Sequence, residues 1–373
     1  MERRLKSHIK QDLKDKLVFL SGPRQVGKTT LSKSLGLEFD YINYDFAAHR
    51  KRIRNLEWNR DAELVIFDEL HKMKKWKAWL KGIYDVEGVN PSIIVTGSAR
   101  MDVYRKGGDS LAGRYFSYRL HPVTVKEASL FMDAEDALER IIELGGFPEP
   151  FLKNDKNFAS RWRRRHLDLV LKEDLRDLDK VKDIHSIEIL VDILRGRVGV
   201  PVSYSSLAED LQVSVHTVKR WLKVLEMLYI IFPVRTYHKN IARSILKATK
   251  YYFYDTGAVD GDRGQRLENA VACCLQAQLH YHEDTTGARV ELAFVRNKQK
   301  QEVDFLTLVD KKPRHLIEVK LSDDKISRNI VYFSKYFPHI ECIQLVHELA
   351  AKKSNRHVKV LPAADFLSRV EFS

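Results

Sequence analysis

Eight residues near the N-terminus have the types and spacing of a phosphate-binding loop. Residues 22–29 read G-x-x-x-x-G-K-T, and the two glycines let the main chain curl so that its N–H groups face phosphate oxygens. Lys28 would place its charge on the β- and γ-phosphates, and the Thr29 hydroxyl can ligate Mg²⁺. We therefore expect ATP and Mg²⁺ to bind here. The residues of this predicted site are Gly22, Pro23, Arg24, Gln25, Val26, Gly27, Lys28, Thr29, Thr30 and, further along the chain, Asp68.

A pair of carboxylates follows an apolar segment downstream of the loop. Leu64–Phe67 contains four apolar residues and is followed by Asp68 and Glu69. Such a run predicts a buried parallel strand whose carboxyl end faces a ligand. There Asp68 would hold Mg²⁺ through water, and Glu69 would polarise the attacking water as general base. The alternative is that Asp68 and Glu69 form an acidic turn without a role in catalysis. The phosphate-binding loop earlier in the chain argues against this alternative.

These residues need a parallel sheet to position them. Leu17–Leu20 is an apolar run suited to a buried strand before the loop, and leucines at helical spacing follow in Thr30–Leu35. Phe39–Tyr44 alternates aromatic and polar residues and predicts a strand between the two motifs, as in P-loop ATPases with a catalytic glutamate. Further strands are expected at Ser92–Thr96 and Tyr115–Leu120.

Three other residues are candidates for contact with the γ-phosphate. Thr96 ends the fourth predicted strand and Ser98 follows it, and either could orient the attacking water; a strand-ending turn explains each equally well. Arg114 precedes the fifth strand, where an arginine finger would deliver its charged fork to transition-state phosphate. A structural ion pair is the other interpretation of Arg114. A finger that acts on a neighbouring copy would require a homo-oligomer.

Composition narrows the class of protein. The chain has 373 residues, which predicts two or three domains, and its net charge of +13 favours nucleic acid or another polyanion as a partner. No segment reaches the ~18 apolar residues of a membrane helix, and the charged stretch Met1–Lys16 has no apolar signal region. The three cysteines have no metal-ligand spacing. We expect a cytoplasmic protein without a membrane segment.

The middle of the chain contains two helical regions. Residues 125–182 carry helical spacing typical of a small lid over a nucleotide. Ser205–Leu211 and Val215–Glu226 predict two helices joined by a short turn, a helix-turn-helix pattern. Alternating segments at Ile230–Tyr237 and Lys250–Tyr254 extend this pattern to a winged helix.

The second helix of this pair is the predicted DNA-reading element. Residues 186–250 hold ten Lys and Arg against five Asp and Glu, a net charge of +5. On the exposed helix face, Lys219, Arg220 and Lys223 are the candidate DNA contacts. Winged helices also bind proteins, and that alternative stays open.

The C-terminal third has a metal-site pattern. Glu268 lies in a predicted amphipathic helix, and Asp304 and Glu318 lie on neighbouring predicted strands. Lys320 shares a strand face with Glu318 because the two are two residues apart. These residues could hold Mg²⁺ or Mn²⁺ and polarise a water. The arrangement resembles the core of PD-(D/E)xK nucleases; a sheet of this kind that binds DNA or protein without cutting is the alternative.

The motifs together resemble one family, the prokaryotic AAA+ ATPases that join an ATP-binding domain to a C-terminal domain of unknown function. Tyr252–Gly257 is similar to a recurring segment of that C-terminal domain. The other matching segments are Gly22–Thr30, Phe67–Glu69, Thr96–Ser98, Leu111–Arg114 and Gly145–Pro148.

The resemblance implies an α/β fold with four parts. We expect an AAA+ P-loop core at 1–124, a helical lid at 125–185, a winged helix-turn-helix at 186–255 and an α/β restriction-endonuclease-like domain at 256–373. It also implies ATP use, while a lid arginine beside the nucleotide is not assigned. The candidates for that arginine are Arg161, Arg163, Arg164 and Arg165.

Two functions remain open from the sequence. The first is an ATPase coupled to DNA binding, with metal-dependent DNA cleavage if the C-terminal site is active. The second is an ATP-dependent signalling or assembly switch whose C-terminal domains bind protein.

Overall fold

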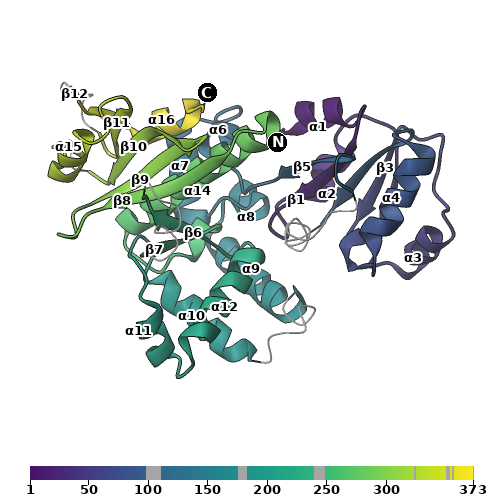
Figure 1. Ribbon diagram of the computed structural model, residues 1–373, viewed down its shortest axis with the longest axis horizontal. Coiled ribbons are helices and arrows are strands. Elements are labelled where there is room, and N and C mark those ends of the chain that lie inside the picture. The colour runs from purple at the N-terminus through teal and green to yellow at the C-terminus, as the bar shows by residue number, and fades with distance from the viewer. Residues whose placement is uncertain are drawn as a thin grey trace. The chain divides into compact units, whose positions relative to one another are not determined.

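The structure is a computed structural model that describes residues 1–97, 111–174, 183–238, 248–322, 325–349, 353–354 and 357–372 (Figure 1). The chain divides into two compact units. The first unit holds Met1–His121 with Met227–Tyr229, and the second holds Pro122–Glu226 with Ile230–Ser373. Each unit contains one of the two sheets.

The first unit is built on a parallel sheet. The strand order is β2-β3-β4-β1-β5, and every neighbouring pair is parallel. β1 and β3 are buried at every residue, which explains why the sequence shows them as unbroken apolar runs. All five predicted strands are confirmed: β1 (Leu17–Ser21), β2 (Phe39–Asn43), β3 (Leu64–Asp68), β4 (Ser92–Thr96) and β5 (Tyr115–Arg119).

The strand order gives a spatial arrangement that the sequence did not predict. The strand that lies between β1 and β3 in the sheet is β4, whereas β2 forms an edge. β2 follows the loop in sequence, but its aromatic and polar side chains are mostly half-exposed, as suits an edge strand. The predicted strand between the two motifs is therefore confirmed along the chain, and β4 is the strand that separates β1 from β3 in the sheet.

Helices and aromatic packing support the sheet of the first unit. The rings of Trp58, Phe67 and Trp79 meet edge to face, with centroids 5.5–6.0 Å apart. The buried Trp76 and Leu80 belong to the same hydrophobic core. The helical segments are α1 (Lys6–Asp12), α2 (Lys28–Lys33), α3 (Ala47–Arg54), a 3₁₀ turn (Leu70–Lys72) and α4 (Trp76–Glu87).

The second unit begins with helices. Those in the predicted lid are α6 (Val125–Ala128), α7 (Ala134–Leu144), α8 (Pro148–Lys153), α9 (Lys156–Leu169) and a π-turn (Val170–Asp174). The next are α10 (Ile184–Arg195), α11 (Tyr204–Asp210) and α12 (Val215–Met227). Ser203 caps α11 by accepting a hydrogen bond from the Ser206 N–H. The two predicted helices and the turn between them are present; their assignment to a winged helix stays a prediction.

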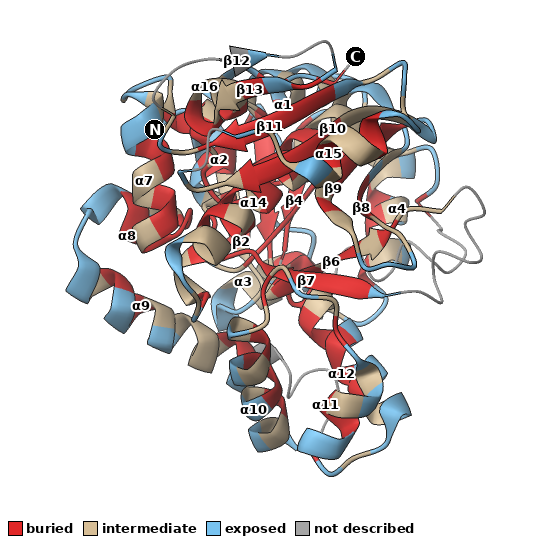
Figure 2. Cartoon of the chain, turned by 90° about the vertical axis from the view of Figure 1, so that its left-hand side faces the viewer, coloured by how far each residue is buried: buried red, intermediate tan, exposed pale blue. Residues whose placement is uncertain are grey.

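An eight-stranded mixed sheet completes the second unit, and Figure 2 shows much of it in the colour of buried residues. Its order is β12-β13-β11-β10-β9-β8-β6-β7. The strands are β6 (Ile231–Thr236), β7 (Thr249–Phe253), β8 (Val290–Arg296), β9 (Glu302–Val309), β10 (Lys312–Lys320), β11 (Glu341–Val346), β12 (Lys353–Ser354) and β13 (Lys359–Pro362). The helical segments around it are a 3₁₀ turn (Thr256–Ala258), α14 (Arg263–Thr286), α15 (Arg328–Ser334) and α16 (Ala363–Arg369).

This sheet crosses the predicted boundary between residues 255 and 256. The strands β6 and β7, expected to form the wing, pair with each other, and β6 also pairs with β8 through Arg235 opposite Ala293. β7 is buried at every residue. The predicted wing strands are therefore part of the same sheet as the C-terminal strands, which brings β7 side chains to the C-terminal site.

Candidate functional site

The phosphate-binding loop connects the end of β1 to the start of α2. Gly27 caps α2 with a φ of 98°, and Gly22 has a φ of 145°, both conformations that favour glycine. A Cβ atom at Gly22 would lie 2.3 Å from the carbonyl oxygen of Leu120, so no larger residue fits there. From the N-terminal segment, Arg3 donates a hydrogen bond to the Val26 carbonyl at 3.2 Å. The sequence did not identify Arg3 as a support of the loop.

Lys28 lies inside this loop. Its Nζ donates hydrogen bonds to the carbonyl oxygens of Gly22 at 3.0 Å and Pro23 at 2.7 Å. Phosphate oxygens can replace neutral carbonyls as acceptors, and they bind an ammonium more strongly because they are charged. The lysine is therefore held at the place where the motif requires it.

Three hydroxyl groups surround the carboxylate of Asp68. Thr29 Oγ1 donates to Asp68 Oδ2 at 2.9 Å, and the Tyr41 hydroxyl donates to the same oxygen at 2.7 Å. Thr96 Oγ1 donates to Asp68 Oδ1 from the neighbouring strand. The structure thus brings together Thr29, Asp68 and Thr96, which the sequence predicted, and adds Tyr41, which it did not identify.

Glu69 follows Asp68 in a strained backbone conformation. Its φ is 56°, and its N–H donates to the Thr96 carbonyl at 3.0 Å. Burial raises the pKa of Glu69 to about 7, although the nearby Lys72 and Lys28 oppose the rise. Lys72 Nζ lies 3.7 Å from Glu69 Oε2, and His71 Nε2 lies 3.5 Å from the same oxygen. A carboxyl group in this environment is well matched to accept a proton near neutral pH.

The donor set fits Mg²⁺ bound with a nucleotide triphosphate. Hydroxyl and carboxylate oxygens of Thr29 and Asp68 are the hard ligands that Mg²⁺ prefers, and they lie beside the phosphate-binding loop. Glu69 lies at the same carboxyl edge of the sheet.

Two candidates from the sequence do not join this group. Arg114 lies at the amino end of β5, beside the start of β1, whereas the loop follows the end of β1. Its Nε lies 2.7 Å from Asp85 Oδ1, and this pairing holds the pKa of Asp85 below its ordinary value. The structural ion pair is therefore present; a finger that acts on a neighbouring copy stays a prediction. Ser98 lies outside the described residues.

The four candidates for a lid arginine lie on α9, and one of them, Arg163, contacts other segments of the second unit. Arg163 Nε donates to Asp255 Oδ2 at 2.7 Å, and its Nη2 donates to the Leu144 carbonyl at 3.0 Å. The Trp162 ring stacks on His166 with centroids 4.7 Å apart. Arg163 thus joins α9 to the segment after β7. The remaining candidates for a lid arginine are exposed: Arg161, Arg164 and Arg165.

The C-terminal candidates also lie together. Asp304 is on β9 and Glu318 on β10, where Ile317 pairs with Phe305 and the Val319 N–H donates to Asp304 Oδ2 at 2.8 Å. Lys320 Nζ lies 2.9 Å from Glu318 Oε1. Burial, with the neighbouring carboxylates, raises the pKa of Asp304 well above its ordinary value. Glu268, on α14, completes the predicted set and adds to this rise.

A lysine that the sequence did not identify lies within this acidic cluster. Lys250 Nζ, on β7, is 2.7 Å from Glu302 Oε1, 3.4 Å from Glu268 Oε1 and 3.8 Å from Asp304 Oδ1. Burial by itself would lower the pKa of Lys250, but these carboxylates outweigh it and raise the pKa above its ordinary value. Across the described ranges, no group of three or more His, Cys, Asp or Glu is arranged to hold a metal ion. The residues of this cluster do not fit a divalent metal, because an ammonium lies among its ligands.

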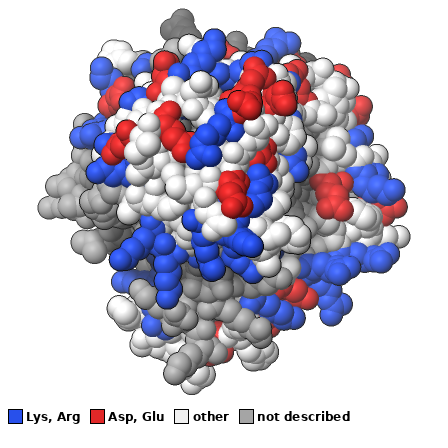
Figure 3. Space-filling model, turned by 90° about the vertical axis from the view of Figure 1, so that its right-hand side faces the viewer, with Lys and Arg blue, Asp and Glu red and all other residues white. Residues whose placement is uncertain are grey.

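The predicted DNA contacts lie on the exposed side of α12, opposite its buried Val218 and Trp221. Lys219 Nζ lies 5.4 Å from the centre of the Tyr204 ring, and Lys223 Nζ pairs with Glu226 at 2.6 Å. Arg220 is exposed between them. On the face that Figure 3 shows, Lys and Arg are mixed with Asp and Glu in the upper part, whereas Lys and Arg predominate in a band across the middle.

Comparisons with known protein families match three successive segments of the chain. Residues 14–129 match the model of an AAA domain. Residues 135–260 and 263–366 match two domains of unknown function, DUF8612 and DUF4143. The matches indicate an AAA-type ATPase domain followed by a C-terminal domain of unknown function, as the resemblance implied. They leave the winged-helix and nuclease-like assignments untested.

Relatives occur in bacteria and archaea. An uncharacterized protein of Mycobacterium tuberculosis is 26% identical over 245 residues, which cover 65% of this chain and 54% of that protein. An uncharacterized protein of Methanocaldococcus jannaschii is 24% identical over 371 residues, 88% of this chain and 81% of that protein. The aligned region thus spans about half the length of the mycobacterial relative.

Among the described residues, no helix is long and apolar enough to cross a membrane.

Proposed function

We propose that this protein binds ATP with Mg²⁺ in its first unit, hydrolyses it, and couples hydrolysis to DNA binding by its second unit. The observation that carries the ATPase proposal is the arrangement of Lys28, Asp68 and Glu69 at one edge of the parallel sheet. The matching AAA domain supports it.

Binding follows from the groups that the loop presents. Lys28 exchanges the Gly22 and Pro23 carbonyls for phosphate oxygens, and loop N–H groups bind the remaining oxygens. Thr29 and Asp68 would hold Mg²⁺, and a bound Mg²⁺ would neutralise charge on the phosphates.

Hydrolysis requires a base beside the attacking water. Glu69 accepts the water proton, and its raised pKa makes its carboxylate a stronger base than an exposed glutamate. The Thr96 carbonyl fixes the Glu69 backbone, and the Thr96 hydroxyl fixes Asp68. Thr96 therefore positions both acidic groups, while Ser98 stays a second candidate for orienting the water.

The variant Glu69→Gln tests the hydrolysis proposal. We expect ATP turnover to fall by about 10³-fold while ATP binding persists, because a general base contributes about 10²–10⁴-fold. Phosphate release measures turnover, and calorimetry measures binding. Glu38→Gln is a matched control, since Glu38 is exposed just before β2 at the other end of the sheet. Unchanged turnover in Glu69→Gln would remove Glu69 as the base.

The DNA part of the proposal rests on α12. Lys219, Arg220 and Lys223 are exposed on one face of a helix that follows a short turn after α11. Such a face can bind the phosphate backbone, and the net charge of the chain favours the encounter. DNA cleavage is not part of the proposal, because Lys250 lies among the carboxylates that would hold the metal.

Salt dependence tests the DNA contacts. In the double variant Lys219→Ala/Arg220→Ala we expect weaker binding to duplex DNA and a salt slope lower by about two, because each side chain that binds a phosphate adds about one to the slope. The control Lys311→Ala/Lys312→Ala removes two exposed charges at the turn between β9 and β10. If DNA neither binds nor stimulates ATP turnover, the DNA proposal fails. A protein partner whose binding depends on ATP would then favour the signalling or assembly switch.

A further inference from the structure

The acidic cluster of the second unit contains its own cation. Lys250 reaches it from β7, whereas Glu302 and Asp304 belong to β9 and Glu268 to α14. Only 1% of the Lys250 side chain is exposed. A buried ammonium is stable only when carboxylates compensate it, so the lysine and the carboxylates depend on each other.

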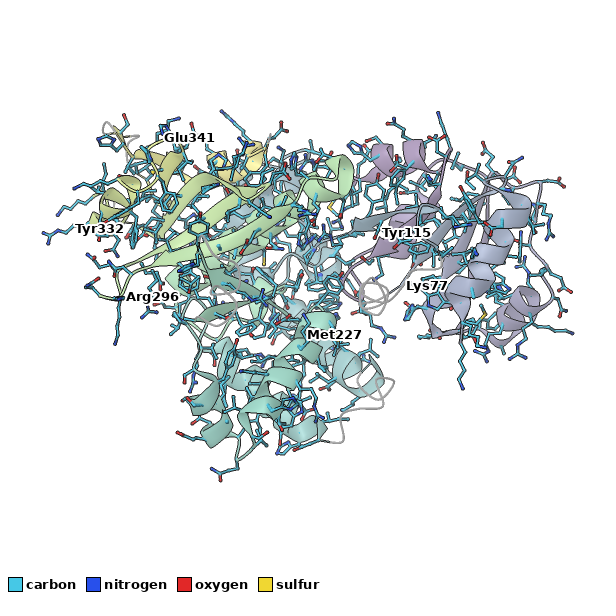
Figure 4. All side chains as sticks on the ribbon, in the orientation of Figure 1. Lys77, Tyr115, Met227, Arg296, Tyr332 and Glu341 are labelled. Atoms are coloured by element: carbon cyan, nitrogen blue, oxygen red, sulfur yellow. The ribbon has the colours of Figure 1, made fainter. Side chains whose placement is uncertain are left out.

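The carboxylates near Lys250 also contact other protein donors. Glu302 Oε2 lies 3.4 Å from Arg296 Nη1, and Figure 4 labels Arg296 on the sheet. Asp304 Oδ2 accepts the Val319 N–H at 2.8 Å. The Tyr252 hydroxyl donates to Glu268 Oε1 at 2.7 Å. Each of these three carboxylates therefore already has protein donors.

Glu318 belongs to the same group but is turned toward Lys320. Its Oε1 lies 2.9 Å from Lys320 Nζ and accepts the Ser327 hydroxyl at 3.2 Å. Its other oxygen, Oε2, is buried without a hydrogen-bond partner. This oxygen is the strongest feature in favour of a metal.

Charge balance points the other way. The cluster has four carboxylates, and the three cationic side chains that pair with them are Lys250, Arg296 and Lys320. A divalent ion would bring excess positive charge into a buried space that is already nearly neutral. It also needs oxygen ligands at about 2.0–2.6 Å. Lys250 Nζ already lies 2.7–3.8 Å from oxygens of Glu302, Glu268 and Asp304, so it competes for these ligands.

We infer that Lys250 is the resident cation of this cluster in place of a divalent metal, and that the C-terminal sheet consequently does not support metal-dependent cleavage. The lysine ties the β6–β7 pair to β9 and α14. The acidic residues that resemble a nuclease site then stabilise the sheet by pairing with the Lys250 ammonium. This inference does not depend on the ATPase proposal.

Binding of Mn²⁺ to the full chain without nucleotide tests the inference. Paramagnetic resonance of free Mn²⁺ would be compared between the wild type and Asp304→Asn, which leaves the loop of the first unit unchanged. We expect the same binding curve for both proteins and no Mn²⁺-dependent DNA cleavage that distinguishes them. Mn²⁺ binding or cleavage by the wild type that Asp304→Asn abolishes would overturn the inference, and would identify Asp304 with Glu318 as a metal site.

Removing the ammonium gives the second arm. Lys250→Met keeps a long side chain without charge, and we expect its Mn²⁺ affinity to rise at least about tenfold because the carboxylates become available as ligands. Lys250→Arg, which keeps the cation, should not gain this site, and Lys250→Met/Glu302→Gln should lose it. A folded Lys250→Met protein without added Mn²⁺ binding would contradict the inference. If Lys250→Met does not fold, the comparison of wild type with Asp304→Asn decides.

Discussion

Both units gather carboxylates and a lysine in one place, but they compensate the charges differently. In the first unit, Asp68 accepts hydrogen bonds from three hydroxyls, and Lys28 donates to two carbonyls. In the second unit, Lys250 pairs directly with the Glu302 carboxylate and lies near Glu268. Asp68 and Lys28 therefore have neutral hydrogen-bond partners, whereas Lys250 is compensated by opposite charges.

This difference separates a site that can accept a ligand from one that is already complete. A neutral hydrogen bond contributes about 1 kcal/mol, so phosphate and Mg²⁺ can replace such bonds at small cost. Breaking a buried ion pair by removing one partner costs about 3–5 kcal/mol. Similar residue types therefore serve ligand binding around Lys28 and structural cohesion around Lys250.

The largest expected effect comes from the lysine of the loop. Lys28→Met should lower ATP turnover by about 10³-fold or more, because it removes the positive charge that binds the phosphates. Its free energy of unfolding should fall by only about 1–2 kcal/mol, since the carbonyls that Lys28 binds are neutral. Phosphate release and chemical denaturation measure the two quantities. Lys10→Met, at an exposed position of α1, is the control, and normal ATP affinity in Lys28→Met would refute the loop assignment.

The lysine of the acidic cluster should show the reverse pattern. Lys250→Met should reduce the local stability of β7 and β9 by about 3–5 kcal/mol, because it leaves buried carboxylates uncompensated. Hydrogen–deuterium exchange of peptides from these strands measures this change, and ATP turnover of the folded protein should remain near that of the wild type. Lys311→Met, at an exposed turn, should alter neither. Exchange in β7 and β9 that matches the wild type would show that Lys250 does not stabilise the cluster.

The grouping of residues in the proposed nucleotide site could be predicted because its signals are local. The loop from Gly22 to Thr29 and the strand that ends at Asp68 each form a short continuous segment. The loop follows the carboxyl end of β1, and the parallel sheet places this end at the same edge as the carboxyl end of β3. Tyr41 was missed because its role depends on β2 lying beside β3, which the strand order decides.

The acidic cluster could be predicted only in part. Glu302 lies two residues before Asp304 and so shares its strand face, a signal that spacing alone contained. Lys250 was not predictable in this way, because its place depends on β6 pairing with β8 across a long stretch of chain.

The recurring glycine segments also have a structural explanation that required the fold. A Cβ atom on Gly145 would lie 1.9 Å from Asp255 Oδ1, and one on Gly257 would lie 1.8 Å from Arg163 Nη2. These glycines make room for the ion pair between Arg163 and Asp255. Two segments of the family resemblance therefore meet in packing within the second unit, and neither contributes a residue to the nucleotide site described above.

The smallest expected effect tests the neutral donors around Asp68. Burial, with the hydrogen bond to Asp68, raises the pKa of Tyr41 to about 12, so its hydroxyl keeps its proton and acts as donor. When Thr29 turns to Mg²⁺, Tyr41 can still hold Asp68 Oδ2. Tyr41→Phe should therefore lower kcat by about tenfold or less, equal to about 1.4 kcal/mol, and change the KM for ATP little.

The control for this prediction is Tyr44→Phe, whose residue follows β2 in the same unit. Steady-state kinetics would compare both variants with the wild type. If Tyr41→Phe raises KM without lowering kcat, Tyr41 contributes to nucleotide binding instead of holding Asp68 during hydrolysis. If it changes neither, the Thr29 and Thr96 hydroxyls are sufficient to orient the carboxylate, and the neutral partners of the first unit are individually replaceable, in contrast to the Lys250 ammonium of the second.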